Sequence, residues 1–266
     1  MFIEIPRDPV KIWFDVTGQA GGEPLVTIGG DLMASRQFHF VEPYLEERFK
    51  LVSWDFRGAG QSGRPIQEYT IDTKVNDLLA VLDAAGIEKT HIWATATGSY
   101  TAIRMAARHP DRVGSVITYA QYKPEPSMWA IWNSLDTIFS QFDWHDSARF
   151  VCKLFGGPVS HEEWICDEFE KGSTAEIYRL MHPPQISSDL TEELRSTVCP
   201  LLVMLGDAGR MGYGSGYAKG YEGMKALRPD LELAVIAGGT GTYSVISHPE
   251  ESARAAIDFL TRNPLS

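Results

Sequence analysis

The sequence lacks the features that mark several common classes of protein. It has no block of lysine and arginine, and it has no run of about 18 apolar residues. Positive charge is in deficit, because 24 lysines and arginines face 35 aspartates and glutamates, for a net charge of −11. Nucleic-acid-binding proteins normally carry a basic patch, and a membrane span needs the apolar run. We therefore expect neither a nucleic-acid partner nor a membrane partner.

Cysteine is also scarce. The chain has three cysteines in 266 residues, Cys152, Cys166 and Cys199, and no two of them have the close spacing of metal ligands. An odd, small number favours buried free thiols over a disulfide framework, as in a reducing cytoplasm. The first residues show neither a basic segment nor a long apolar one, so we expect no signal peptide and a cytoplasmic location.

The residues that are present indicate a globular α/β protein. Apolar residues make up 44% and charged residues 22% of the chain. Short β-like runs at 2–5, 11–16 and 25–28 precede an alternation of helical and strand patterns. Helices are predicted at 35–49, 72–85, 98–109 and 249–261, and strands at 51–55, 90–94, 116–119, 201–205 and 233–236. Such alternation predicts a mostly parallel sheet flanked by helices.

Residues 122–187 interrupt this alternation with aromatic-rich sequence of helical spacing. Four of the seven tryptophans lie there, among them Trp129, Trp132 and Trp144. We interpret the segment as a helical cap whose apolar face covers a pocket, although a helix that merely packs on the main domain would show the same spacing. The predicted core domain is then 1–121 with 188–266. Prolines near both ends of the insertion, including Pro183 and Pro184, are candidate hinges.

Several motifs follow one another along nearly the whole chain. They are P-L-V-T-I-G-G at 24–30, D-F-R-G-A-G-Q-S at 55–62, A-T-A-T-G at 94–98 and H-P-E-E at 248–251. In this order they resemble motifs of the α/β-hydrolase superfamily: the strand that leads to the oxyanion loop, the D-x-R-G-x-G-x-S turn, the nucleophile elbow and the start of the last helix. The resemblance implies the α/β-hydrolase fold, a mostly parallel sheet flanked by helices with a helical cap insertion.

The positions that this resemblance assigns to the catalytic triad hold other residues. The nucleophile position is Ala96, the acid position is Gly209 and the histidine position is Thr242. A methyl group cannot attack a substrate, and threonine has no basic nitrogen. Thr95 and Thr97 flank Ala96, but each needs an adjacent base to act as a nucleophile. Their hydroxyls fit local hydrogen bonding at a helix start equally well.

One acidic residue is well placed for chemistry. The resemblance implies that the residue after Gly30 offers its backbone N–H to an oxyanion hole, with Thr97 as the second donor. That residue is Asp31, whose side chain should enter the pocket. Apolar surroundings would raise its pKa and suit it to general acid–base work. Alternatively, Asp31 is a loop or helix-capping carboxylate.

The cap supplies the remaining candidates. Trp129, Trp132, Trp144 and His145 are predicted to contact a ligand, and His182 lies in the same segment. Either histidine could reach a ligand or lie on the surface. The aromatic cap favours a hydrophobic or aromatic small molecule as partner.

Neither a metal site nor a cofactor site is predicted. Residues 212–216 are glycine-rich but lack the spacing of a phosphate-binding loop, so we interpret them as a loop at the pocket rim. Three functions stay open. The chain is a non-hydrolytic enzyme of isomerase, epimerase, lyase or cyclase type, a non-catalytic ligand-binding protein, or a lactonase- or esterase-like hydrolase with displaced catalytic residues. The sequence also leaves monomer and homodimer open.

Overall fold

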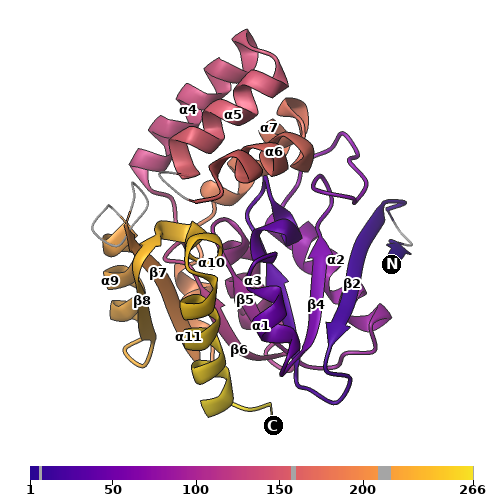
Figure 1. Cartoon of the computed structure of the whole chain (residues 1–266), viewed down its shortest axis with the longest axis vertical. Coiled ribbons are helices and arrows are strands. Elements are labelled where there is room, and N and C mark those ends of the chain that lie inside the picture. The colour runs from indigo at the N-terminus through magenta and orange to yellow at the C-terminus, as the bar shows by residue number, and fades with distance from the viewer. Residues whose placement is uncertain (6–7, 157–159, 209–216, 266) are drawn as a thin grey trace.

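A twisted sheet runs through the middle of the molecule (Figure 1). In the computed structural model, which describes residues 1–5, 8–156, 160–208 and 217–265, eight strands pair in the order β1-β2-β4-β3-β5-β6-β7-β8. They are β1 (Phe2–Glu4), β2 (Lys11–Gly18), β3 (Pro24–Ile28), β4 (Lys50–Asp55), β5 (Thr90–Ala94), β6 (Val113–Thr118), β7 (Leu201–Ala208) and β8 (Glu232–Thr240). β2 pairs antiparallel with β1 and with β4, and all other pairs are parallel. The carboxyl ends of the six parallel strands therefore lie at one edge of the sheet.

Helices cover the sheet. They are η1 (Ala34–Phe38), α1 (Glu42–Glu46), α2 (Ile71–Ala84), α3 (Gly98–Arg108), α8 (Thr191–Ser196), α9 (Tyr217–Leu227), η2 (Gly241–Tyr243), α10 (Ser244–Ser247) and α11 (Pro249–Arg262). In one group α1 packs against α11, and in the other successive contacts join α2, α3, α8 and α9. This arrangement is the α/β layering that the alternating pattern predicts.

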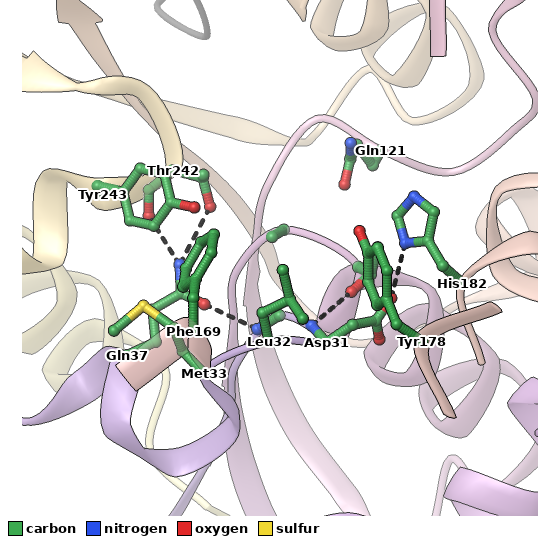
Figure 2. Close-up of a pocket in the computed structure, with 13 residues that line it drawn as sticks. Asp31, Leu32, Met33, Gln37, Gln121, Phe169, Tyr178, His182, Thr242 and Tyr243 are labelled. Carbon is green, nitrogen blue, oxygen red and sulfur yellow. Dashed lines mark hydrogen bonds and ion pairs between the residues drawn. The ribbon is translucent and has the colours of Figure 1, made fainter. Parts of the chain in front are cut away.

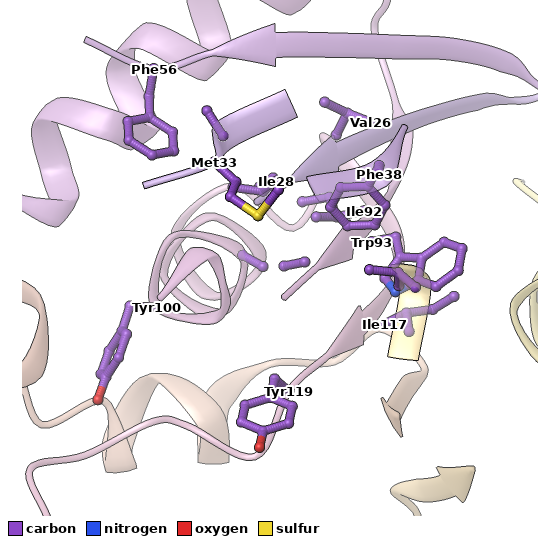
Figure 3. Close-up of a cluster of buried hydrophobic side chains, with 14 of the residues drawn as sticks. Val26, Ile28, Met33, Phe38, Phe56, Ile92, Trp93, Tyr100, Ile117 and Tyr119 are labelled. Carbon is purple, nitrogen blue, oxygen red and sulfur yellow. The ribbon is translucent and has the colours of Figure 1, made fainter. Parts of the chain in front are cut away.

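The central strands are buried because helices cover both of their faces. All five residues of β5 are buried, which explains why this strand has no polar alternation. Trp93 of β5 meets Phe38 edge to face, with ring centroids 5.4 Å apart, in the core shown in Figure 3. The same packing holds the carboxyl end of β5 in place, where the chain turns sharply into α3.

The helix α2 has clear signals at both ends. The hydroxyl of Thr70 accepts a hydrogen bond from the Thr73 N–H at 3.1 Å, which caps the first turn. Gly86 follows the last turn with a φ of 67°, a conformation that glycine adopts without strain. The face of α2 that carries Ile71, Val75 and Leu78 is buried, as its spacing predicts.

A group of four helices stands above one end of the sheet (Figure 1). They are α4 (Pro126–Gln141), α5 (Trp144–Gly156), α6 (Glu162–Gly172) and α7 (Ala175–Ile186). All four fall inside the predicted cap, 122–187, and we refer to them as the cap; the domain boundaries themselves stay a prediction. The expected hinge at Pro183 and Pro184 is wrong, because both prolines lie inside α7.

Two further expectations from the sequence are corrected. The single helix expected at 35–49 is two short pieces, η1 and α1, because the chain bends between Phe38 and Glu42. The expectation of three free thiols is also wrong. Cys152 and Cys166 form a disulfide, with Cα atoms 5.2 Å apart, because α5 and α6 pack side by side. Cys199 is the free, buried thiol.

Among the described residues, none of the helices combines the length and the apolar character needed to cross a bilayer.

Candidate active site

The turn between β5 and α3 has the backbone conformation of a nucleophile elbow, with Ala96 at its apex. Ala96 at this turn has a φ of 47°, in the left-handed region that costs a non-glycine residue energy. Gly30, which follows β3, lies directly opposite. A Cβ atom on Gly30 would come within 3.0 Å of the Ala96 Cβ, so only glycine fits there without a shift. The two loops therefore meet closely at the carboxyl edge of the sheet.

A cavity of about 70 Å³ opens at this meeting point, between the sheet and the cap (Figure 2). The core contributes Gly30, Asp31, Leu32, Met33, Gln37, Ala96, Thr97, Gln121, Thr242 and Tyr243, and the cap contributes Phe169, Tyr178 and His182. No serine or cysteine occurs among these lining residues of the described chain. The lining is mostly apolar, with a few polar groups that converge from both sides.

Asp31 borders the cavity and makes three polar contacts. Its carboxylate accepts hydrogen bonds from Lys74 Nζ, His182 Nδ1 and Gln185 Nε2, each at 2.8 Å. Lys74 comes from α2, whereas His182 and Gln185 come from α7 of the cap. Asp31 is 4% exposed, so these contacts form in a nearly dry environment. One carboxylate thus joins the core to the cap.

The charge of Lys74 decides the ionisation of Asp31. Burial by itself raises the pKa of Asp31, but the Lys74 ammonium and the His182 hydrogen bond outweigh it and hold that pKa below its ordinary value. The pKa rise expected from apolar surroundings is therefore wrong, because Lys74 was not foreseen. Asp31 is a carboxylate at neutral pH and is not suited to act as a general acid.

The ionised Asp31 fixes the tautomer of His182. A carboxylate only accepts hydrogen bonds, so Nδ1 of His182 carries the proton in their contact. In the neutral ring the basic lone pair then lies on Nε2, which has no partner among the described residues. The ring packs against Trp132 and Tyr178, with centroids 5.2 and 4.9 Å away. These contacts hold the imidazole at the wall of the cavity (Figure 2).

The opposite wall of the cavity holds no comparable base. Gln37 accepts a hydrogen bond from the Gly30 N–H at 2.7 Å and donates to the Thr242 carbonyl at 3.3 Å. Thr242 lies in η2 and is buried, with its hydroxyl 3.5 Å from the same amide nitrogen. This side of the cavity is built from neutral groups that hold the loops together. Gly209, the residue expected at the acid position, lies outside the described residues, as does the glycine-rich loop at 212–216.

The expected oxyanion hole is modified. The N–H of Asp31 donates to the Thr97 hydroxyl at 3.2 Å instead of pointing freely into the cavity. Thr97 then has its own hydroxyl proton available to donate, because the oxygen already accepts one hydrogen bond. Thr95 is buried, does not line the cavity, and its hydroxyl has no hydrogen-bond partner in the described part of the chain.

The cap residues expected to contact a ligand do not line the cavity. Trp132 packs behind His182, and Trp144 donates its ring N–H to the Glu170 carbonyl at 2.8 Å. Trp129 is half-buried and packs on the core cluster. His145 is 57% exposed and pairs with Glu170. The helical spacing located the apolar face of α4 but could not show that α7 packs on this face and lines the cavity with Tyr178 and His182.

Several residues at the site were missed, and one of them had a signal. Lys74 interrupts the apolar stripe of α2, three residues after Ile71 and four before Leu78. A lysine at such a position is buried with a partner or is misplaced. Gln37, Gln121, Phe169, Tyr178 and Gln185 carried no comparable signal. In the described residues, no group of three or more histidine, cysteine or acidic side chains could hold a metal ion.

Part of the chain matches the model of a known family. The family model described as "alpha/beta hydrolase fold" matches residues 23–151. A RutD protein of Caulobacter segnis, whose name proposes a carbamate hydrolase, is 32% identical over 120 residues, which are 43% of this chain and 45% of that protein. The yeast protein named "Uncharacterized hydrolase YNR064C" (Saccharomyces cerevisiae) is 24% identical and aligns over 97% of this chain and 96% of its own length. The match with the RutD protein therefore spans about half of that relative.

A solved structure extends the likeness to the whole chain. The enol-lactonase from Burkholderia xenovorans LB400 superposes with a TM-score of 0.83 over 98% of this chain and 100% of its own, at 20% identity. At that identity the likeness concerns the fold. The strand order, the turn at Ala96, the family model over residues 23–151 and this superposition agree that the chain has the α/β-hydrolase fold.

Proposed function

We propose that the protein catalyses proton transfer on a small hydrophobic carbonyl compound, in a reaction of isomerase or lyase type that forms no covalent intermediate. The observation that carries this proposal is the His182–Asp31 pair, which brings an oriented imidazole to a cavity where the elbow holds Ala96. Acid–base chemistry needs a positioned base, a stabilised anion and a pocket that excludes water. It does not need a serine.

Each step of the reaction has a group to perform it. Nε2 of His182 removes a proton from the carbon next to the substrate carbonyl, and the electron pair moves onto the carbonyl oxygen. The Thr97 hydroxyl, which already accepts the Asp31 N–H at 3.2 Å, donates to that oxygen. The imidazolium formed is stabilised by the Asp31 carboxylate at 2.8 Å. Nε2 then returns the proton to a different carbon, so the substrate is isomerised with no net gain or loss of atoms.

A second candidate is hydrolysis through water that His182 activates, and the relatives named as hydrolases favour it. Nε2 would take a proton from water as the water oxygen attacks the carbonyl carbon. The C–O bond to the leaving group then breaks, and the leaving oxygen receives the proton from His182. This route also uses no serine, so the two candidates differ in product and not in machinery.

One compound tests both candidates. α-Angelica lactone is a five-membered β,γ-unsaturated enol lactone. Proton transfer converts it into the α,β-unsaturated isomer, with deuterium incorporated at the γ-carbon in D₂O, whereas hydrolysis gives 4-oxopentanoic acid. We expect NMR to show the deuterated isomer with the wild-type protein. Accumulation of the acid alone would support the second candidate.

The matched variant is His182→Asn. Its side-chain amide can still donate to Asp31 but has no basic nitrogen, so the rate should fall by about 10²–10⁴. Unchanged turnover in this variant would contradict both candidates. Binding of the lactone with no conversion would instead support the non-catalytic ligand-binding protein.

A further inference from the structure

One polar side chain at the cavity lacks a hydrogen-bond partner for its oxygen among the described residues. Gln121 lines the cavity, is 8% exposed, and its Oε1 atom has no hydrogen-bond partner among the described residues. An amide oxygen buried without a partner is unfavourable in the ligand-free protein, so such groups are rare in folded proteins. The mechanism proposed above does not use this residue.

The backbone on either side of Gln121 is held in place. Its N–H donates to the Tyr119 carbonyl at 2.8 Å, and the next carbonyl, that of Tyr122, accepts from the Leu190 N–H at 2.8 Å. The residue thus lies just past β6, where the chain leaves the sheet for the cap. These bonds anchor the backbone from which the Gln121 side chain extends to the cavity.

Gln37, the other glutamine of the cavity, uses both ends of its amide for hydrogen bonds within the protein. Gln37 accepts from Gly30 with its oxygen and donates to Thr242 with its nitrogen, so it joins two loops. Gln121 makes no such pair of contacts. Two glutamines of the same cavity therefore differ, because one is used by the protein and the other is left with an acceptor facing the ligand space (Figure 2).

The charges around the cavity limit what Gln121 can bind. No lysine or arginine occurs among the described lining residues, and the charge of Asp31 is compensated by Lys74. A carboxylate ligand would find no counterion and would lie near Asp31, which makes its desolvation costly. The volume of about 70 Å³ favours a small molecule as ligand.

We infer that Gln121 is a specificity-determining residue that accepts a hydrogen bond from an N–H or O–H group of a small uncharged ligand. This inference builds on the proposed function, because it describes the substrate of the same cavity. The Gln121 amide binds the donor group, and the apolar lining holds the remainder of the molecule. Anionic analogues of the same size are excluded.

Three probes of five non-hydrogen atoms separate the features involved. Propanamide is neutral and has N–H donors, butanone is neutral without a donor, and propanoate is an anion. Ligand-observed NMR should rank the affinities in that order, with propanamide about tenfold tighter than butanone, which corresponds to one well-formed hydrogen bond. In Gln121→Met the advantage of propanamide over butanone should disappear. Equal or tighter binding of propanoate by the wild-type protein would overturn the inference.

Stability supplies a readout that needs no ligand. Gln121→Met removes a buried oxygen without a partner and keeps a similar volume, so the melting temperature should rise by about 2–4 °C. The same change at Gln37, whose amide is hydrogen-bonded at both ends, should lower the melting temperature. A decrease in Gln121→Met would mean that the amide is used within the protein, which contradicts the inference. Because binding and melting are measured without turnover, they succeed or fail independently of the lactone experiment.

Discussion

The two walls of the cavity differ in what they retain from the motifs of the α/β-hydrolase fold. The core wall keeps the backbone of the elbow, with Ala96 at a φ of 47°, but its side chains are neutral groups such as Gln37 and Thr242. The cap wall presents His182, held by an ionised Asp31. Under the proposed function, the fold preserves the geometry of the turn at Ala96 while the basic group comes from the cap.

The largest expected effect follows from a change at Asp31, where the core wall and the cap wall meet. Asp31→Asn keeps the shape of the side chain but leaves Lys74 without its counterion and no longer fixes the His182 tautomer. Turnover should fall by about 10²–10⁴. The free energy of unfolding should fall by about 3–5 kcal/mol, because a buried charge loses its partner. Urea denaturation and the lactone assay measure the two quantities.

A matched control lies on α7, the helix that carries His182. Arg179 of α7 pairs with Asp136 of α4 at 2.7 Å, but both side chains are substantially exposed. Asp136→Asn should cost at most about 1 kcal/mol and leave turnover unchanged. Equal losses in the two variants would mean that Asp31 serves only to attach the cap, and the comparison between the walls would fail.

The next effect concerns the cap alone. The disulfide between Cys152 and Cys166 closes a loop with a sequence separation of 14. A loop of this length contributes about 3 kcal/mol in the chain-entropy description. We expect Cys166→Ser to lower the stability of the cap by up to that amount and to leave the sheet folded, as hydrogen exchange would show. Thiol titration of the denatured wild-type protein should find one free thiol, Cys199, and a count of three would contradict the pairing.

The pH dependence of stability isolates the Asp31 charge. The pKa of Asp31 in the folded protein lies below its ordinary value of 3.8, so its ionised form contributes stability above that pH and loses it as the pH falls through the folded pKa. The difference in unfolding free energy between wild type and Asp31→Asn should therefore shrink as the pH falls below 3.8. Burial raises the pKa of Asp55 and of Asp77, but both proteins carry these groups, so they cancel in the difference. A difference that grows on acidification would contradict the assignment.

The smallest expected effect is at the elbow. Ala96→Ser restores a hydroxyl, but Thr242 offers no base to activate it, so a fluorophosphonate probe should label neither the wild type nor this variant. Labelling of the variant alone would show that Nε2 of His182 reaches the elbow. The double variant Ala96→Ser with Thr242→His rebuilds a nucleophile and a base and should give measurable labelling by mass spectrometry. Labelling of the wild type at Thr95 or Thr97 would show that the core wall has a nucleophile after all.

Local sequence patterns were sufficient to predict most of the strands, helices and turns. The alternation of strands and helices, the turn at Ala96 and the entry of Asp31 into the pocket depend on periodicity and on motifs within a few residues of one another. The glycine that ends α2 and the buried β5 are of the same kind. Such features are decided by neighbours along the chain, so the sequence by itself determined them.

The tertiary structure decided which charges meet. Asp31 pairs with Lys74, 43 residues away, and with His182, 151 residues away. The cap tryptophans had the right spacing for an apolar face, but α7 packs on the face of α4, and its Tyr178 and His182 line the cavity instead. The same packing of cap helices joined Cys152 to Cys166. A pKa, a tautomer and a disulfide depend on distances of a few ångströms between residues far apart in the chain, and only the packing of the cap on the sheet sets those distances.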